Sequence, residues 1–274
     1  MSSSIAVDVL IPSLDRPEGL QRALESVERV RKAESQLDLR IHVVDREGGS
    51  AAGAAAARNI AAARGSAPYI AFLDDDDEWI APRLSRAVEI LEGQPRVALV
   101  AGQARRTSGG NFLPSPLETE QDRDHAALAL DCFVCTSTVT LRREDFEAEQ
   151  GMAEELERAE DYDLWLRLTR DGRRVRLLPE ELAIYSDNTG GLSEDPVEMA
   201  RASLAALRRS AQMPADDRTW RSRVGRLEAV LSHGLSKEGN FSEAILLSGR
   251  ALLNSPTSRV AWTSSLRALL RLRR

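Results

Sequence analysis

The residues best suited to chemistry form an acidic run in the middle of the chain. Asp74–Glu78 are five consecutive acidic residues, and they follow the apolar segment Tyr69–Leu73. Side chains alternate along an extended backbone, so Asp74 and Asp76 are expected on one side and the other two aspartates on the opposite side. Carboxylates this close repel one another by roughly 1 kcal/mol per pair even in water, and a divalent cation would remove that repulsion. The run therefore predicts a site for Mg²⁺ or Mn²⁺ and for substrate phosphates, the alternative being a solvated acidic turn.

A second acidic pair, Glu160-Asp161, opens the segment Glu160–Arg170, whose apolar spacing predicts a helix. Acidic side chains in the first turn stabilise a helix through its dipole, so capping is one interpretation. A carboxylate beside a cleft can also remove a proton from an attacking hydroxyl, which is the role of a general base. The spacing leaves both interpretations open.

Arg58 is the third candidate, within the alanine-rich segment Ala51–Arg64. A guanidinium at this point could pair with a phosphate or with one of the aspartates. The preceding Gly48–Gly53 is rich in glycine but contains no GxxxxGK[ST], and no GxGxxG follows the first apolar strand. P-loop and dinucleotide-binding enzymes are therefore disfavoured.

The chain contains two cysteines, Cys132 and Cys135, spaced as CxxC. A zinc site would need two further ligands, and the three histidines (His42, His125, His233) show no ligand spacing. A thioredoxin-type redox pair would need a βαβ setting of its own. We therefore predict that both cysteines are packing residues.

Composition narrows the class of protein. The chain has 274 residues, a net charge of −6, 42% hydrophobic and 29% charged residues, a balance that disfavours disordered and membrane-embedded proteins. The apolar runs are far shorter than the roughly 20 residues of a membrane span, and no positive region precedes Ile5–Ile11. We expect a cytoplasmic location.

Strand and helix signals alternate in the first part of the chain and must position these candidates. We expect strands at Ala6–Ile11, Ile41–Val44, Tyr69–Leu73 and Val97–Ala101, and helices at Pro17–Glu34, Ala51–Arg64 and Pro82–Leu91. Asp15 is the expected cap of the first helix. This pattern predicts an α/β fold with a mainly parallel central sheet flanked by helices. Ligands bind such sheets at the carboxyl ends of the strands, where Asp45 and the acidic run fall.

The middle of the chain is less regular. We expect a loop at Asn111–Asp124, strands at Thr136–Leu141, Arg173–Leu178 and Leu182–Tyr185, and a flexible loop at Asp187–Glu194. From about Pro196 the pattern is helical. We therefore expect a sheet domain at residues 1–195 and a helical region at residues 196–274, in which Ser232–Pro256 resembles one tetratricopeptide-type hairpin.

The end of the chain also differs in charge. From Arg201 onward there are 14 Lys and Arg against 5 Asp and Glu. The segment Arg267–Arg274, with its interleaved leucines, has three interpretations. They are a peripheral contact with anionic lipid at the inner face of the membrane, a solvated helix face, or a contact with the acidic domain of a second copy in a homodimer.

These segments together resemble the family 2 glycosyltransferases, which have the GT-A nucleotide-sugar-binding fold. The matching motifs, in chain order, are VDVLIPSLDRPEGLQRALESV, IHVVD, AAARNIAAARG, YIAFLDDDDEW and EDYDLWLRL, covering about residues 6–190. The resemblance implies a metal-dependent, inverting hexosyltransferase. Such an enzyme moves a sugar from a nucleotide-diphosphate donor, here a UDP-sugar, to a hydroxyl acceptor in glycan or glycoconjugate synthesis.

The resemblance also implies a role for each residue that matches the family's motifs. Mn²⁺ or Mg²⁺ is the implied cofactor. The implied nucleotide-sugar-binding residues are Ser13, Asp15, Asp45, Arg58, Asp74 and Asp75; the metal ligands are Asp76 and Asp74; the catalytic base is Asp161; and the acceptor-binding residue is Glu160.

Two other functions remain as alternatives. One is a non-catalytic GT-A-like protein that binds or assembles partners through its helical tail. The other is a nucleotidyltransferase, which is less favoured because the glycine-rich, Arg- or Lys-containing loop such enzymes carry after the first strand is missing. The expected partners are a nucleotide-diphosphate sugar and a saccharide, lipid-linked or protein acceptor, and no nucleic acid.

Overall fold

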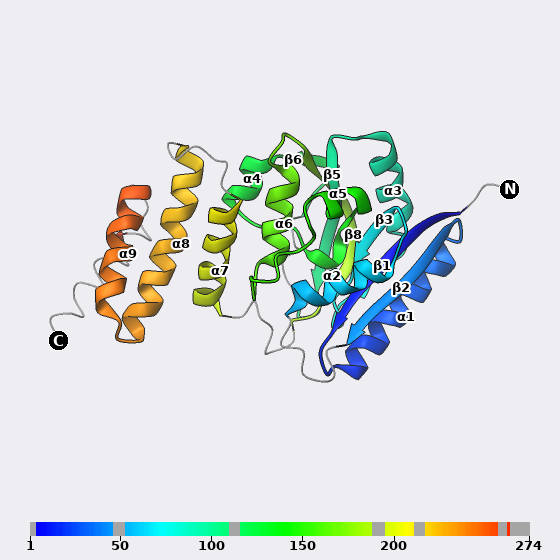
Figure 1. Cartoon of the computed structure of the whole chain (residues 1–274), viewed down its shortest axis with the longest axis horizontal. Helices are drawn as coiled ribbons and strands as arrows, with labels where there is room; N and C mark the ends of the chain where they lie inside the picture. Colours follow the sequence, from blue (N-terminus) through cyan, green and yellow to red (C-terminus); the bar gives the residue numbers. More distant parts are fainter. Residues whose placement is uncertain are drawn as a thin grey trace. The chain divides into compact units, whose positions relative to one another are not determined.

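A mixed β-sheet forms the centre of the first part of the chain (Figure 1). The computed structural model describes residues 4–45, 53–109, 116–187, 195–210, 217–256 and 262–263. They fall into two units: unit 1 is Met1–His125 with Phe133–Asn188, and unit 2 is Ala126–Cys132 with Thr189–Arg274.

The described residues of unit 1 form an eight-stranded sheet in the order β2-β1-β3-β7-β5-β8-β4, with β6 paired to β8. The longer pairings, β1 with β2, β1 with β3 and β5 with β8, are parallel, and the short ones are antiparallel. The strands are β1 (Ile5–Ser13), β2 (Leu37–Asp45), β3 (Tyr69–Phe72), β4 (Glu78–Trp79), β5 (Val97–Arg106), β6 (Gln121–Arg123), β7 (Thr140–Arg142) and β8 (Arg174–Tyr185). The predicted α/β layering is confirmed.

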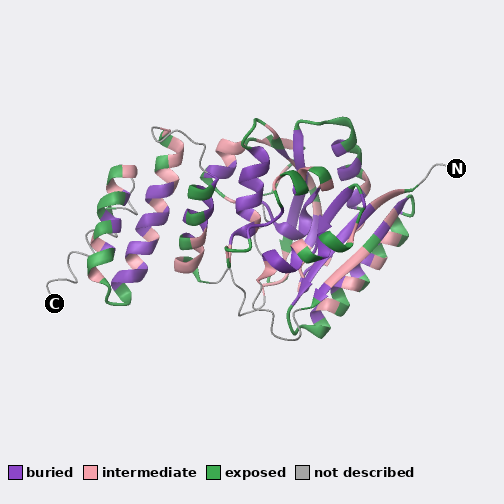
Figure 2. Ribbon diagram, viewed as in Figure 1, coloured by how far each residue is buried: buried purple, intermediate pink, exposed green. Residues whose placement is uncertain are grey.

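Helices cover the sheet and enclose an apolar core (Figure 2). They are α1 (Pro17–Ala33), α2 (Ala54–Arg64), α3 (Leu84–Gly93), α5 (Arg143–Ala148) and α6 (Glu160–Thr169), with a 3₁₀ turn η1 at Thr136–Thr138. The centres of β1 and β3 are buried on both faces, which is why these strands are apolar runs rather than alternating ones. The alanines of α2 let the helix lie close to the sheet.

Four local predictions are wrong. Arg16, not Asp15, occupies the N-cap position of α1, and no side chain bonds the helix there, since Pro17 removes one of the N–H groups that would need a partner. The predicted strand Thr136–Leu141 begins as the η1 turn, and the two strands predicted within Arg173–Tyr185 are one strand, β8. The predicted loop Asn111–Asp124 contains β6, which pairs with β8.

Unit 2 is helical in its described residues, as the pattern predicts. It contains α7 (Pro196–Arg209), α8 (Arg218–Lys237) and α9 (Phe241–Asn254), together with most of α4 (His125–Leu130). Helices α8 and α9 form a hairpin, with Gly239 at a φ of 85° in its turn and Asn240 capping α9. The fully buried carboxylate of Glu228 accepts a hydrogen bond from Asn254 at 2.9 Å and pairs with Arg250 at 3.1 Å.

In the described part of the chain, no helix is both long and apolar enough to cross a membrane. The predicted loop at Asp187–Glu194 and the basic segment Arg267–Arg274 lie outside the described residues, except for Asp187.

A carboxylate from the end of α1 caps α3. Helix α3 has no side-chain cap of its own at Arg83. Instead, the buried Glu34 accepts hydrogen bonds from the backbone N–H groups of Arg83, Leu84 and Ser85, at 2.6–3.1 Å. Burial alone would raise the pKa of Glu34, but these N–H groups hold it below its ordinary value. The ionised carboxylate therefore joins two helices that are about 50 residues apart in sequence.

Replacing Glu34 by Gln is expected to lower the free energy of unfolding by about 1–3 kcal/mol, because the amide cannot satisfy three buried donors. Since the pKa of Glu34 is lowered on folding, its contribution is present above the unfolded-state pKa and lost as the pH falls through the folded-state value. The difference between wild type and Glu34→Gln should therefore shrink between about pH 7 and about pH 3 in urea unfolding. Glu25→Gln, an exposed carboxylate on α1, is the matched control. An equal effect from both variants would contradict the capping role.

Candidate active site

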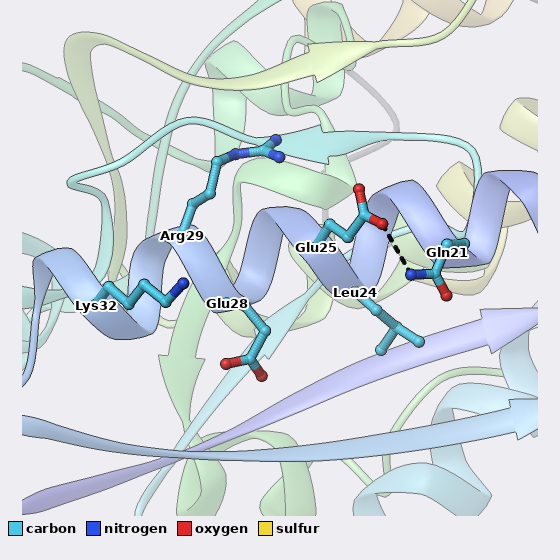
Figure 3. A pocket seen from close by; sticks show the side chains of 6 residues that line it. All are labelled: Gln21, Leu24, Glu25, Glu28, Arg29 and Lys32. Carbon is cyan, nitrogen blue, oxygen red and sulfur yellow. Dashed lines mark hydrogen bonds between the residues drawn. The ribbon is translucent and has the colours of Figure 1, made fainter.

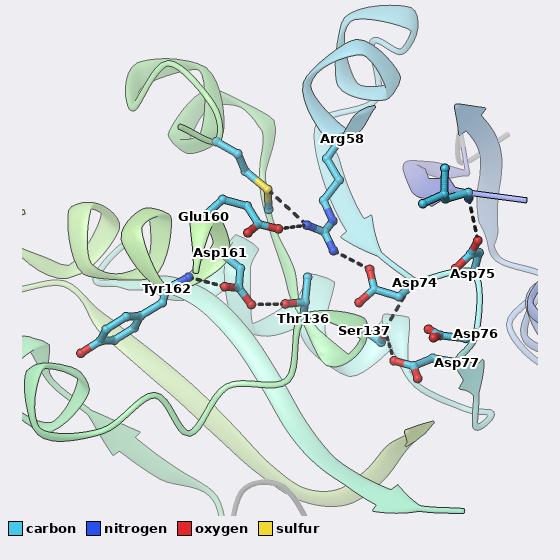
Figure 4. A network of polar contacts seen from close by, with 12 residues as sticks. Arg58, Asp74, Asp75, Asp76, Asp77, Thr136, Ser137, Glu160, Asp161 and Tyr162 are labelled. Atoms are coloured by element: carbon cyan, nitrogen blue, oxygen red, sulfur yellow. Dashed lines mark hydrogen bonds and ion pairs between the residues drawn. The ribbon is translucent and has the colours of Figure 1, made fainter. Parts of the chain in front are cut away.

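The acidic run is a turn between β3 and β4. The N–H of Asp77 donates to the carbonyl of Asp74 at 3.1 Å, which closes the turn. The predicted alternation of Asp74 and Asp76 against their neighbours is therefore wrong, because it assumed extended backbone. Asp74 and Asp77 instead accept from different side chains, Arg58 and Ser137, as Figure 4 shows.

The loop between β1 and α1 holds one side of this turn. The guanidinium of Arg16 lies 3.2 Å from Asp75 and 2.5 Å from Asp76, and the N–H of Leu14 donates to Asp75 at 3.0 Å. A Cβ at Gly19 would lie 2.6 Å from the carbonyl oxygen of Asp75, so only glycine lets the first turn of α1 approach this closely. All of these contacts come from residues 14–19, which follow β1.

Arg58 joins the two acidic motifs (Figure 4). Its side chain, from α2, is buried, and it donates to Asp74 at 2.5 Å and to Glu160 at 2.6 Å. Burial alone would lower the pKa of Arg58, but the two carboxylates raise it above its usual range, so the guanidinium stays charged. The acidic turn and the start of α6 therefore both contact one buried cation, which places the two predicted acidic motifs next to each other.

Asp77 and Ser137 anchor the acidic turn, although no sequence motif indicates a role for either of them. Asp77 is buried; it accepts a hydrogen bond from the hydroxyl of Ser137 at 2.6 Å and from the N–H of Ser186 at 2.9 Å. The same hydroxyl accepts from the N–H of Asp74 at 3.0 Å. Burial and the charge of Asp74 raise the pKa of Asp77 well above its ordinary value. The only sequence signal for this anchor is the hydroxyl-rich run Thr136–Thr138.

Asp161 lies beside Glu160 but has different partners. Its carboxylate accepts a hydrogen bond from the hydroxyl of Thr136 at 2.5 Å and from the N–H of Tyr162 at 2.7 Å, and it is half-buried. Glu160 is buried against Arg58; burial raises its pKa, although Arg58 opposes this rise. The two neighbouring acids thus have distinct environments, one facing a cation and one facing neutral donors.

The residues fit a divalent ion only together with a ligand that brings further oxygens. Among the described residues, no group of three or more His, Cys, Asp or Glu is arranged to hold a metal. Asp74 and Asp76 supply the hard oxygen donors that Mg²⁺ and Mn²⁺ prefer, and one or two carboxylates plus phosphates are a usual set for Mg²⁺. Burial and the charge of Asp74 raise the pKa of Asp76, and an added cation would oppose this rise. In the structure itself, Arg16 and Arg58 offset the carboxylate repulsion.

The residues predicted to bind the nucleoside lie at the same edge of the sheet. Ser13 and Asp45 are opposite each other at the ends of the parallel strands β1 and β2; Ser13 is buried and Asp45 exposed. Asp15 is exposed and has a left-handed φ of 48°. Their role in binding stays a prediction, and residues 46–52, which follow Asp45, lie outside the described chain.

Two surface depressions among the described residues of unit 1 lie away from these residues. One, of about 400 Å³, is lined entirely by residues of α1 (Figure 3). A second, of about 510 Å³, contains Tyr69 and Arg142, at the opposite end of β3 from the acidic turn. Neither contains a predicted site residue. Cys135 is buried, as the packing prediction requires, whereas Cys132 is only half-buried.

Comparisons with known proteins bear on the family and the fold. Residues 25–149 match the family model of Glycosyl transferase family 2. Amylovoran biosynthesis glycosyltransferase AmsB of Erwinia amylovora is 34% identical over 158 residues, which are 55% of this chain and 52% of AmsB. The chain thus spans about half the length of that relative.

Two solved structures share the fold. TarS 1-349 of S. aureus, in complex with UDP, has a TM-score of 0.64 at 16% identity, covering 98% of this chain and 89% of TarS. Mannosyltransferase PcManGT of Pyrobaculum calidifontis, in complex with GDP-Man and Mn²⁺, has a TM-score of 0.59 at 14% identity, covering 97% of this chain and 84% of PcManGT.

The chain therefore has the GT-A fold of these two structures. The family match then makes this more specific: residues 25–149 match the family 2 glycosyltransferases, and the resemblance to that family is confirmed over this part of the chain.

Replacing Arg58 by Met is expected to lower the free energy of unfolding by about 3–5 kcal/mol, because it leaves buried Glu160 without its cation. Burial raises the pKa of Glu160, and Arg58 opposes that rise. A carboxylate whose pKa is raised on folding stabilises the folded state at low pH, and this contribution is lost as the pH rises and the carboxylate ionises. The loss in Arg58→Met should therefore be larger at about pH 8 than at about pH 5.

Urea unfolding of the double variant Arg58→Met, Glu160→Gln is the control. Removing the unpaired carboxylate should recover part of the stability and most of the added pH dependence. A double variant no more stable than Arg58→Met would contradict the pairing as the cause.

Proposed function

We propose that the protein is an inverting glycosyltransferase that moves a sugar from a nucleotide-diphosphate donor to a hydroxyl acceptor in the synthesis of a glycan or glycoconjugate. The observation that carries this proposal is the junction at Arg58, which brings the acidic turn and the start of α6 together. A phosphate-facing group and a candidate base must be neighbours for such a transfer. AmsB, the relative noted above, is a biosynthetic glycosyltransferase by name.

In the proposed reaction, the acceptor oxygen forms a bond to the anomeric carbon of the sugar. The bond from that carbon to the diphosphate oxygen breaks, and the nucleoside diphosphate leaves with the electron pair. Asp161 takes the proton of the acceptor hydroxyl on the opposite face of the sugar. Glu160, fixed by Arg58, helps to place the acceptor, which is a saccharide, lipid-linked or protein hydroxyl.

The donor would lie along the carboxyl edge of the sheet. Ser13, Asp15 and Asp45 are assigned to the nucleoside, and Arg58, Asp74 and Asp75 to the rest of the donor. Asp76 and Asp74 would hold Mn²⁺ or Mg²⁺, which when bound neutralises charge on the leaving diphosphate. The complexes of TarS with UDP and UDP-GlcNAc and of PcManGT with GDP-Man and Mn²⁺ support this class of donor and cofactor. A UDP-sugar is the donor we propose.

Asp161→Asn is expected to lower turnover by at least about 100-fold, because an amide cannot accept the acceptor's proton. Asp76→Ala is expected to raise the Mn²⁺ concentration needed for half-maximal turnover, because it removes a carboxylate ligand. The measurement is release of nucleoside diphosphate from a panel of UDP- and GDP-sugars in the presence of Mn²⁺.

Asp171→Asn is the matched control, since Asp171 is exposed in the turn after α6. It should keep wild-type turnover. If wild type and both site variants are equally inert on the whole panel, while UDP still raises the melting temperature, the non-catalytic binding function is favoured instead.

A further inference from the structure

The η1 turn is held in place from several sides. The indole Nε1 of Trp79 donates to the carbonyl of Ser137 at 2.9 Å. The guanidinium of Arg83 donates to the carbonyls of Ser137 and Thr138 at 3.0 and 2.9 Å and stacks 4.1 Å from the Trp79 ring centre. The three side chains of η1 are buried. A group carried by this turn therefore has little freedom to move.

Thr136 is the residue of this turn that reaches Asp161. Its hydroxyl donates to Oδ2 of Asp161 at 2.5 Å, while the N–H of Tyr162 donates to Oδ1 at 2.7 Å. The two donors come from different elements, η1 and α6, so they fix both the position and the plane of the carboxylate (Figure 4). An ionised carboxylate has about four lone-pair sites, so sites remain for a substrate hydroxyl.

Arg58 is near enough to Asp161 to interact with its charge, but it makes no direct ion pair with it. Arg58 makes its ion pairs with Asp74 and Glu160, and within the described chain no Lys or Arg lies at ion-pair distance from Asp161. Cys135, which precedes Thr136, is a buried thiol whose pKa is raised by that burial, so it adds no charge. Asp161 is thus oriented by neutral donors and is not neutralised by an ion pair.

We propose that Thr136 is a positioning residue that sets Asp161 for proton removal from the acceptor. The inference rests on the proposed function, in which Asp161 is the base. Thr136 touches neither the sugar nor the nucleotide in this assignment; it acts through Asp161. Its branched Cβ restricts the side-chain rotamer, so the hydroxyl is directed without further contacts.

The test compares three variants. Thr136→Val keeps the shape and removes the hydroxyl, and Thr136→Ser keeps the hydroxyl. Thr138→Val is the matched control, because the buried Thr138 hydroxyl donates only to a backbone carbonyl, that of Cys135, at 2.7 Å. The readouts are kcat and KM with the sugar nucleotide that wild type uses, and the affinity for UDP with Mn²⁺ measured by calorimetry.

Thr136→Val is expected to lower kcat by about 10–100-fold, since a misplacement of about 1 Å can cost this much. The KM for the donor and the UDP affinity should stay within about twofold, because the acidic turn is anchored by Ser137 instead. Thr136→Ser should recover most of kcat, and Thr138→Val should keep it.

Two results would overturn the inference alone: Thr136→Val with wild-type kcat while Asp161→Asn is inactive, or an equal loss in Thr136→Val and Thr138→Val. Full activity in Asp161→Asn, or no activity in wild type, would instead overturn the proposed function and the inference with it. A fall in UDP affinity parallel to the fall in kcat would show a structural role and also contradict the inference.

Discussion

The site depends on compensating a buried cation. Arg58 is buried, and a guanidinium in such a place is stable only if acceptors replace its hydration. Asp74 and Glu160 do so, from segments that lie 16 and 102 residues away from Arg58 in sequence. Glu160 depends on Arg58 in the same way. Without this cation, the buried Glu160 carboxylate would have to become exposed or protonated. One side chain therefore fixes the separation of the two acidic motifs.

The topology of the sheet supplies the other half of the geometry. Because β3 and β2 both pair in parallel with β1, their carboxyl ends meet at one edge. The segment after β1 then runs directly past the turn after β3, so Leu14 and Arg16 contact it without any long loop. The small size of Gly19 completes this approach. The acidic turn is thus in contact with both the loop after β1 and the first turn of α1.

Hydrophobic periodicity predicted the helices and strands well, but it predicted poorly the side chains that anchor the acidic residues. The apolar runs and the helical spacing after Pro17 depend on local burial, which a sequence displays directly. Thr136, Ser137 and Asp77 gave no such signal, because their roles come from partners 25 and 60 residues away. The alternation expected in the acidic run failed for a related reason: a single hydrogen bond from Asp77 to Asp74 closes a turn there. Resemblance to a family located the acids, but only the fold assigned their partners.

Residue type alone cannot distinguish the acids of this site, since the chain has 43 Asp and Glu. Asp77 is buried and hydrogen-bonded to a hydroxyl and an N–H, which suits an anchor. Asp74 and Glu160 share one guanidinium, so both carboxylates are already engaged in ion pairs. Asp161 differs from these in being only partly buried and directed by neutral donors. A base must keep its charge available to substrate, so the partners of each carboxylate, more than its acidity, decide which one can act.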